Sequence, residues 1–306
     1  MTTVTFTKQP TILPASKTES IFDDMGYPAA PVARLRGAFA AGYVGDLDIT
    51  RRVLDMHAAL ATAGIQGALR IAFAPDFALL GQDASAAPIV TRAFGLGSYG
   101  LDWLAGGDPG LKITAVGTTA PRSVLDIKGS IGTNPKITAA AGADLINGLT
   151  GVTMMAAINL AAVQAAQTSF FSVRYNGSGF FGIGMISGKL QAIVRRTTAV
   201  AAAQILVDPP AINMWVIVTV RFDPATGAVA VLVNDVPATG LSGTFTDTGA
   251  SVSVATTSTC DVQIGSVVSG QRPGLLSDVW IFDKALTTGE ATAAYTAMRA
   301  ANPQMP

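Results

Sequence analysis

The stretch Trp215-Val-Ile-Val-Thr-Val-Arg-Phe222 decides the fold, together with the two segments that follow it, Asp223-Pro-Ala-Thr-Gly227 and Val229-Ala-Val-Leu-Val-Asn234. Apolar residues dominate both valine-rich runs, which is typical of strands in a β-sheet. The segment between them combines Asp, Pro and Gly, the residues that favour a tight turn. The stretch therefore predicts an antiparallel β-hairpin.

Short runs of the same kind occupy most of the chain after Pro88, with turn residues such as Asn176-Gly177 between them. About ten short strands at this spacing are typical of an antiparallel two-sheet β-sandwich or barrel, and they argue against a parallel α/β sheet. The predicted strands are residues 111–116, 123–128, 152–160, 170–175, 180–185, 190–196, 215–222, 228–234, 261–267 and 276–282.

The N-terminal part of the chain has a different pattern. Prolines 10, 14, 28 and 31 interrupt any long helix in residues 1–45, which we therefore expect to form an extended arm. A helix is predicted over residues 48–63, with Asp48 as its N-cap and Gly64 at the position that often ends a helix. A strand is predicted at 68–73.

We place a domain boundary near Ala87, because residues 82–88 are typical of a linker. This divides the chain into a small α-containing module at 1–87, which includes the arm, and a β-sandwich at 88–306. The sandwich is expected to end in one helix, because Thr287-Thr-Gly-Glu290 is a capping box followed by helix-forming residues up to about residue 300.

Later segments continue the pattern with Val262-Gln-Ile-Gly265 and with Gly274-Leu-Leu-Ser-Asp278-Val-Trp-Ile-Phe-Asp283. In this order the motifs resemble the laminin G-like form of the concanavalin A-like lectin/glucanase superfamily, over residues 88–300. The resemblance implies a jelly-roll sandwich. In that family Asp278 and Asp283 fall in a structural segment, and Trp215 and Trp280 fall at positions that pack the core.

The whole chain, rich in Ala, Gly and Thr, is similar to structural proteins of tailed bacteriophages and gene-transfer particles, such as head fibres, decoration proteins and tail proteins. This similarity implies a virion protein that is made in the host cytoplasm. It also implies attachment to other virion proteins through residues 1–87, and a homo-oligomer, with a trimer preferred.

The composition excludes several classes of partner. Lys+Arg and Asp+Glu are equal at 20, and charged residues make up 13% of the chain, against about 25% in typical soluble proteins. A zero net charge gives no field that would attract nucleic acid or an anionic membrane. The longest apolar stretch, residues 151–166, is interrupted by Asn159 and Gln164, so no membrane insertion is expected. The N-terminus lacks the apolar region of a signal peptide.

Catalysis has little support in the sequence. Glycosidases of this superfamily use two carboxylates, usually glutamates. Glutamate occurs only as Glu19 and Glu290, and Glu290 belongs to the capping box. The single histidine, His57, has no triad pattern around it, and the single cysteine, Cys260, has no Cys or His partner. We therefore expect no enzyme and no cofactor, with an Asp–Asp pair assembled from loops as the remaining catalytic alternative.

The fold resemblance allows one structural Ca²⁺ held by loop aspartates. The alternative is that these aspartates are solvated turn formers, which the absence of a clustered D-x-D-x-D pattern favours. The sequence does not single out a ligand set from the candidates Asp102, Asp108, Asp208, Asp247 and Asp261.

Aromatic and short polar side chains could bind carbohydrate, because sugar rings stack on aromatic faces. The paired phenylalanines 170/171 and 180/181 suggest that one ring of each pair faces outward. Outward rings could equally be contacts between subunits. The candidate carbohydrate-binding residues are Tyr99, Trp103, Tyr175, Asn176 and Phe180.

Three functions remain after these arguments. The first is a non-enzymatic virion protein whose lectin-like domain contacts a host-surface polysaccharide. The second is a purely structural cement or assembly protein of the capsid or tail. The third, a polysaccharide hydrolase, is disfavoured by the missing glutamate pair.

Overall fold

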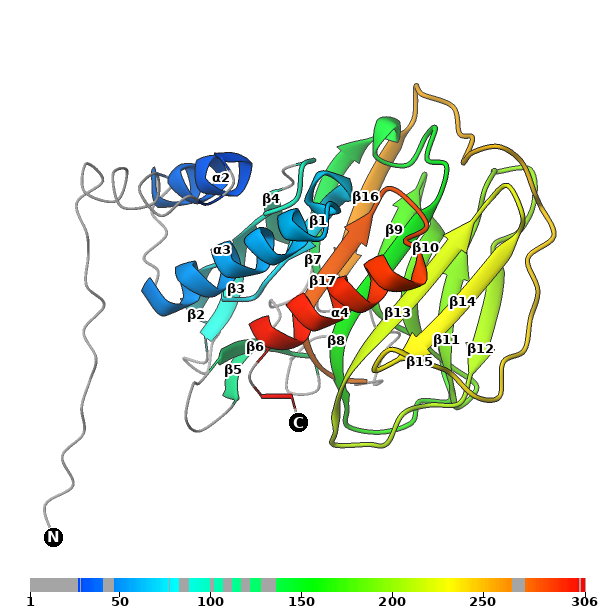
Figure 1. Ribbon diagram of the computed structural model, residues 1–306. Helices are drawn as coiled ribbons and strands as arrows, with labels where there is room; N and C mark the ends of the chain where they lie inside the picture. The colour runs from blue at the N-terminus through cyan, green and yellow to red at the C-terminus, as the bar shows by residue number, and fades with distance from the viewer. Residues whose placement is uncertain are drawn as a thin grey trace, which may run out of the picture.

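The computed structural model describes residues 27, 29–40, 47–76, 78–82, 88–99, 102–106, 112–116, 122–127, 136–265, 273–302 and 304–305. Two β-sheets lie face to face, and a layer of helices covers the outer face of one of them (Figure 1). The predicted mainly β, antiparallel two-sheet sandwich is therefore confirmed.

The first sheet, called here the helix-covered sheet, has the long strand β17 (Gly274–Phe282) at its centre. On one side β17 pairs with β1 (Leu69–Phe73) and, at its beginning, with β6 (Arg122–Asp126). On the other side the sheet continues through β8 (Val152–Leu160), β13 (Trp215–Asp223), β14 (Ala228–Val233) and the short β15 (Val236–Pro237). Every one of these pairings is antiparallel.

The second sheet is also antiparallel. Its strands, in spatial order, are β2 (Ala78–Gln82), β3 (Pro88–Phe94), β4 (Asp102–Gly106), β7 (Lys136–Gly142), β16 (Thr259–Ile264), β9 (Thr168–Tyr175), β10 (Ser178–Ile186), β11 (Lys189–Val194) and β12 (Ala203–Val207). Strand β5 (Lys112–Val116) pairs with β6 and β3, so it joins the two sheets along one edge.

Strand β8 shows how one sequence fills two cores. Met154, Ala156 and Ile158 face the second sheet and belong to the core between the sheets. Met155 and Ala157 alternate with them and belong to the core beneath the helices. Successive side chains of a strand point to opposite faces, so a strand that is covered on both faces must be apolar at nearly every position.

The helical layer consists of α2 (Ala29–Ala40), α3 (Leu47–Thr62) and α4 (Thr288–Ala301). Figure 1 shows α3 and α4 lying across the front of the sheet. Together with α2 they bury Ile217, Trp280 and Phe282. The family resemblance implied that Trp280 packs the sandwich core, but it lies in the core beneath the helices. No helix in the described residues is long and apolar enough to cross a membrane.

The N-terminal part of the chain contains two helices, α2 and α3, of which only α3 was predicted. The expectation that residues 1–45 form only an extended arm is wrong, because α2 lies within them; residues 1–26 and 41–46 lie outside the described part. Helix α3 begins at Leu47, one residue before the predicted N-cap Asp48. The predicted end at Gly64 is confirmed. Gly64 has φ +71°. Its amide donates to the Ala61 carbonyl, and the Ile65 amide donates to the Leu60 carbonyl, which is the pattern of a helix that ends at a glycine.

Both sheets contain strands from the N-terminal side of the predicted boundary near Ala87. Strand β1 forms a ladder with β17, and β2 pairs with β3. Residues 69–82 thus contribute backbone hydrogen bonds to the sandwich, and the helices of residues 29–62 share a core with its strands. The segments on the two sides of residue 87 therefore pack as one body.

All ten predicted strands are present, with ends shifted by a few residues. Strands β2, β3, β4, β7, β12 and β15 were not predicted from the sequence. Strand β7 reads Lys-Ile-Thr-Ala-Ala-Ala-Gly, and alanine and glycine have low strand propensity. Its position between β4 and β16, set by tertiary pairing, determines its conformation.

The capping box of α4 is confirmed, and Thr153 ties this helix to the sheet. The Thr153 hydroxyl is buried; it donates to the Lys284 carbonyl at 2.9 Å and accepts from the Leu286 amide at 2.9 Å.

We predict that Thr153→Val lowers the free energy of unfolding by about 1–3 kcal/mol, because the isosteric side chain leaves both backbone groups without this partner. Urea unfolding measures the loss. Thr292→Val, which removes only an exposed hydrogen bond to Asp235, is the control, and equal stability of the two variants would contradict the assignment.

His57 on α3 is 1% exposed, and neither ring nitrogen has a hydrogen-bond partner among the residues that the structure describes. Burial lowers its pKa from 6.5 to about 4. The folded state therefore binds fewer protons than the unfolded state between these two values. We predict that the contribution of His57 to stability falls as the pH drops from 6.5 towards 4, by roughly 2–3 kcal/mol.

His57 is the single histidine of the chain, so its contribution can be isolated. Denaturant unfolding of the parent and His57→Leu at pH 7 and at pH 4.5 gives the comparison. The parent should lose more stability than the variant over this interval. An identical pH dependence in both proteins would show that His57 is not held in its neutral form.

Candidate functional site

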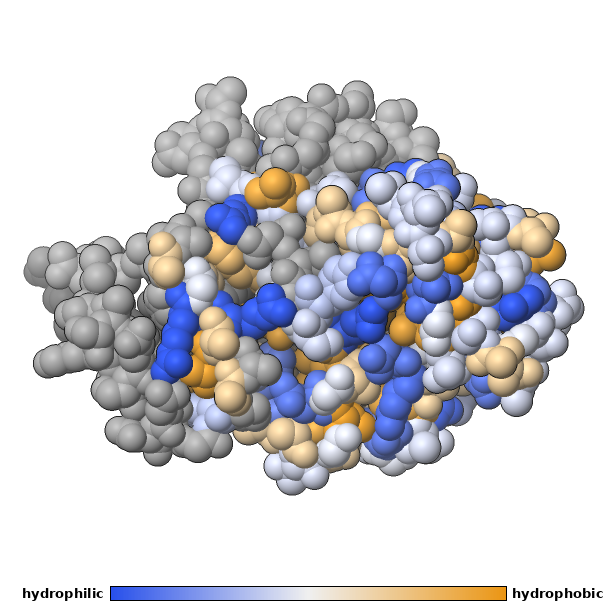
Figure 2. Space-filling model, turned by 90° about the horizontal axis from the view of Figure 1, so that it is seen from above, coloured by the Kyte–Doolittle hydropathy of each residue, from blue (hydrophilic) through white to orange (hydrophobic). Residues whose placement is uncertain are grey.

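Polar side chains from several loops meet at one end of the sandwich, where β7, β9 and β17 end and β10 and β16 begin. Figure 2 looks down on this end, and hydrophilic residues run across the middle of the described surface. We call this group the rim. Its members are Arg70, Tyr99, Asp144, Arg174, Asn176 and Ser258.

The turn between β9 and β10 places Asn176 on the rim. Asn176 and Gly177 have φ values of +46° and +78°, so this is the two-residue hairpin turn that Asn-Gly sequences favour. The Asn176 side-chain amide donates to the Ser258 hydroxyl at 3.2 Å, and its backbone amide donates to the Thr259 carbonyl at 3.2 Å. Nε of Arg174 donates to the Gly177 carbonyl at 2.9 Å. The turn is thus held against the neighbouring loop while the Asn176 side chain stays exposed.

Tyr99 anchors the other side of the rim. Its hydroxyl donates to Oδ1 of Asp144 at 2.8 Å and accepts from the Gly142 amide at 3.2 Å. The Arg70 guanidinium lies 5.3 Å from the centre of the Tyr99 ring and also donates to the Asp144 carbonyl. Partial burial, and then the hydrogen bond to the Asp144 carboxylate, raise the pKa of Tyr99 above its usual value of 10. The ring is half-buried and keeps part of its surface open to solvent.

Gly142, the last residue of β7, allows Asp144 to take this position. A Cβ at residue 142 would lie 2.4 Å from Oδ1 of Asp144. With glycine there, the carboxylate lies close over the backbone and reaches the Tyr99 hydroxyl. A larger residue at 142 would displace the carboxylate.

Strand register connects the two sides of the rim. Gly142 lies opposite Thr259 in the pairing of β7 with β16, and the Asn176 amide donates to the carbonyl of the same Thr259. Tyr99 and Asn176, which are far apart in the sequence, are therefore separated by only the beginning of β16. Of the predicted carbohydrate-binding residues, the structure brings these two together with their side chains at least partly accessible.

The other three predicted residues are buried. Trp103 is 0% exposed in β4, where its ring packs edge-on against Phe73 with centroids 5.4 Å apart. The Tyr175 ring packs on Phe180, and its hydroxyl donates to the Ala255 carbonyl at 3.0 Å. The Arg195 guanidinium lies 5.2 Å from the centre of the Phe180 ring. None of these rings offers an open face on which a sugar could stack.

The related expectation that one ring of each phenylalanine pair faces outward is wrong. Phe170, Phe171, Phe180 and Phe181 are all buried and all belong to the core between the sheets. Register shifts in the pairing of β9 with β10, between residues 179 and 181 and between residues 183 and 184, interrupt the simple alternation on which the expectation relied.

Sequence reasoning did not identify four residues of the rim: Arg70, Asp144, Arg174 and Ser258. Each is a single polar residue in a different segment, and no local motif links them. The nearest signal was the Asn176-Gly177 turn, which fixed the position of one loop but not its neighbours.

The aspartates considered as Ca²⁺ ligands have other partners where the structure describes them. Asp208 accepts from Lys189 at 2.6 Å and from the Thr239 hydroxyl, Asp247 pairs with Arg196 at 2.6 Å, and Asp261 accepts from Gln263. Asp108 and the side chain of Asp102 lie outside the described residues. Within the described part of the chain, no group of three or more His, Cys, Asp or Glu is placed to hold a metal ion. Asp208, Asp247 and Asp261 therefore make local contacts within the protein.

Two other side chains that could take part in chemistry, Cys260 and Glu290, are not among the rim residues. Burial and the negative charges of Asp261 and Asp144 raise the pKa of the Cys260 thiol to about 11, so it remains protonated at neutral pH. The Glu290 carboxylate accepts from Lys284 at 2.6 Å and from the Thr287 amide in the capping box. Cys260 is thus a buried core residue, and Glu290 stabilises the start of α4.

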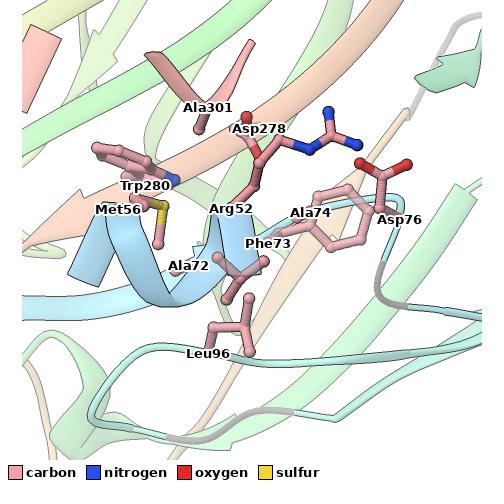
Figure 3. Close-up of a pocket in the computed structure, with 11 residues that line it drawn as sticks. Arg52, Met56, Ala72, Phe73, Ala74, Asp76, Leu96, Asp278, Trp280 and Ala301 are labelled. Carbon is pink, nitrogen blue, oxygen red and sulfur yellow. The ribbon is translucent and has the colours of Figure 1, made fainter. Parts of the chain in front are cut away.

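A small hollow between α3, β1 and β17 also contains charged residues (Figure 3). Arg52, Asp76 and Asp278 line it together with Met56 and Trp280. Asp278 is buried and accepts from the side-chain amide of Asn302, and Asp76 accepts from the Ser123 amide at 2.7 Å. The first bond joins the end of α4 to β17, and the second joins the chain after β1 to β6, so the residues of the hollow hold the fold together.

Comparisons with known proteins bear on the fold. No family model and no curated protein matches the sequence. The chain is similar in structure to the botulinum neurotoxin serotype D ligand-binding domain solved with N-acetylneuraminic acid, with a TM-score of 0.52, 12% identity, and coverage of 78% of this chain and 52% of that one. A structure reported as showing that cell entry of botulinum neurotoxin type C depends on two ganglioside molecules gives a TM-score of 0.52, 13% identity, and coverage of 78% and 53%.

At this level of identity the likeness establishes the fold alone. The chain spans about half the length of the solved domains that it matches. The shared part is a jelly-roll-like β-sandwich, in agreement with the architecture described above.

The hydrogen bond between Tyr99 and Asp144 gives a test of the rim geometry. We predict that Asp144→Asn lowers the pKa of Tyr99, because the substitution removes the negative charge that disfavours the phenolate. NMR titration of tyrosine ring carbons, with Tyr99→Phe used to assign the signal, measures the change. Asp208→Asn, at the opposite end of the sandwich, is the control. An unchanged Tyr99 titration in Asp144→Asn would contradict the contact.

Proposed function

We propose that this chain is a non-enzymatic carbohydrate-binding domain and that the rim is its binding site. The observation that carries the proposal is the cluster of accessible hydrogen-bonding groups from separate loops at one end of a jelly-roll sandwich. Sugar hydroxyls both donate and accept, so a site for them needs mixed donors and acceptors in fixed positions.

The rim contains such a set. Asn176 offers an amide, Ser258 a hydroxyl and Asp144 a carboxylate, and the half-exposed Tyr99 ring adds an apolar surface beside them. Hydrogen bonds to neighbouring backbone hold Asn176 and Tyr99 in place, so binding would cost little side-chain entropy. Botulinum neurotoxin domains of similar fold include one solved with N-acetylneuraminic acid, which supports the same class of ligand.

We further propose that the carbohydrate is a host-surface polysaccharide and that the protein is displayed on a virion. The low-charge, alanine-rich sequence and its similarity to phage structural proteins support this part of the proposal. Attachment through residues 1–87 and a trimeric homo-oligomer belong to the same hypothesis.

An assembly role, as a cement protein of a capsid or tail, is the second candidate. It is favoured by apolar side chains at the end of the sandwich opposite the rim, where Val163, Ile212 and Met214 are 46%, 49% and 51% exposed. The amide of Asn213 donates to the Leu160 carbonyl at 2.6 Å, so the two loops that carry these residues lie side by side. Exposed apolar groups of this kind are common at assembly surfaces.

A matched pair of variants tests the carbohydrate site. Asn176 and Asn213 are both exposed, both have left-handed backbone (φ +46° and +58°), and they lie at opposite ends of the sandwich. Glycine tolerates this backbone, so Asn176→Gly and Asn213→Gly should both preserve their turns. We predict that Asn176→Gly weakens binding to a polysaccharide found on a glycan array by about tenfold, the value of one lost hydrogen bond.

Asn213→Gly should bind with the affinity of the parent protein. Surface plasmon resonance on the immobilised polysaccharide compares the three proteins. If the array shows no binding, or if both variants bind as the parent does, the rim is not a carbohydrate site and the assembly role becomes the better account.

A further inference from the structure

Two Asn-Gly sequences occur in the chain, Asn147-Gly148 and Asn176-Gly177. In such a sequence the backbone nitrogen of the glycine can attack the side-chain carbonyl carbon of the asparagine, because glycine has no side chain to obstruct the approach. The reaction converts the asparagine into aspartate or isoaspartate without an enzyme. The fold restrains the reacting groups of these two sites to very different degrees.

Both reacting groups of the Asn147-Gly148 site are held in place. The Gly148 amide donates to the Val252 carbonyl at 2.8 Å, and Oδ1 of Asn147 accepts from the Val254 amide at 3.1 Å. The Gly148 nitrogen must lose its proton before it attacks, so the first of these bonds has to break. The second bond keeps the side-chain carbonyl from turning towards that nitrogen. This site is therefore protected.

The Asn176-Gly177 site, in the turn between β9 and β10, lacks these restraints. Both residues are exposed, and within the described part of the chain the Gly177 amide donates no hydrogen bond and Oδ1 of Asn176 accepts none. The side chain is held only through Nδ2, which donates to the Ser258 hydroxyl at 3.2 Å. An exposed hydrogen bond of this kind is readily exchanged for one to water, so the side chain can turn towards the Gly177 nitrogen.

Arg174 places a positive charge beside the same turn. Its Nε donates to the Gly177 carbonyl at 2.9 Å, and its Nη2 donates to the same oxygen. A nearby cation favours the anionic form of a group, so the guanidinium lowers the cost of removing the proton from the Gly177 amide. The charge at this turn therefore assists the attack.

We propose that Asn176 is a site of spontaneous deamidation. The deprotonated Gly177 nitrogen forms a bond to Cγ of Asn176, and the bond between Cγ and Nδ2 breaks. Nδ2 takes up the proton that Gly177 lost and leaves as ammonia, and the product is a cyclic succinimide. Water then opens the ring at either of its carbonyl carbons, which gives aspartate or isoaspartate.

Either product changes the surface of the rim. A carboxylate replaces the amide that donates to Ser258, and the chain, whose formal net charge is zero, gains one negative charge. Isoaspartate also carries the main chain through Cβ. The longer backbone no longer fits the two-residue turn, in which Asn176 and Gly177 have φ +46° and +78°. The modification therefore alters the rim as the protein ages.

Peptide mass spectrometry of the full-length chain tests the site. Trypsin places the two Asn-Gly sequences on different peptides, residues 137–174 and 175–189, and fragment spectra assign a change to one residue. The protein is incubated in mildly alkaline buffer. Asn176 should show the mass gain of deamidation at least about tenfold faster than Asn147, because the hydrogen bond of the Gly148 amide adds to the barrier there.

The unfolded chain is the first control. In guanidinium chloride the two sites should react at comparable rates, because only the folded structure distinguishes them. Ion-exchange chromatography follows the acidic product in two variants. Asn176→Gln should abolish the product, since the longer side chain would have to close a larger ring. Asn213→Gln, at an equally exposed position with left-handed backbone, should leave it unchanged.

The proposal is overturned if Asn176 keeps its amide, if the two sites react at the same rate in the folded protein, or if the acidic product still forms in Asn176→Gln. None of these measurements uses a ligand, so they are independent of carbohydrate binding at the rim.

Discussion

The apolar outer face of β17, β8 and β13 is the constraint on which the rest of the structure depends. Trp280, Phe282, Met155 and Ile217 project from this face, and water would surround them if nothing covered it. Burying large apolar side chains is worth about 1.5–3 kcal/mol each. The helices from both ends of the chain meet this requirement, so the N-terminal segment and the C-terminal helix are parts of one fold.

This covering also determines where functional surfaces can lie. Helices close one face of β8, β13 and β17 and the second sheet closes the other, so these three strands offer ligands no open face. The loops at the ends of the sandwich remain accessible, and they can vary without disturbing either core. Both the rim and the apolar loops at the opposite end are built from such segments.

The architecture could be predicted from the sequence because the motifs that indicate it each lie within a short segment of the chain. The hairpin of β13 and β14, the Asn176-Gly177 turn and the capping box of α4 each lie within a few consecutive residues, and each is present in the structure. Strands β4 and β7 have no such local signal, since only their neighbours hold them in a sheet. The missed β4 accounts for the error at Trp103: this candidate carbohydrate-binding residue lies in a strand, and its side chain enters the core.

The candidate site was less predictable for the same reason. Asp144 reaches Tyr99 because β7 ends in glycine, and Asn176 reaches Ser258 because β9 and β16 are paired. Both facts depend on strand register between distant segments, which composition and spacing do not specify. Tyr175 and Phe180 were chosen as carbohydrate-binding candidates because they are aromatic, but their rings lie in the core between the sheets.

Hydrogen–deuterium exchange of the full-length chain, with and without a polysaccharide identified on a glycan array, tests the central claim most directly. Bound sugar should slow exchange around Tyr99, at residues 142–145, at residues 174–178 and around Thr259. The loops that carry Val163 and Ile212 should exchange at the same rate in both samples. Protection confined to those loops, or no protection at the rim, would contradict the assignment of the rim as the carbohydrate site.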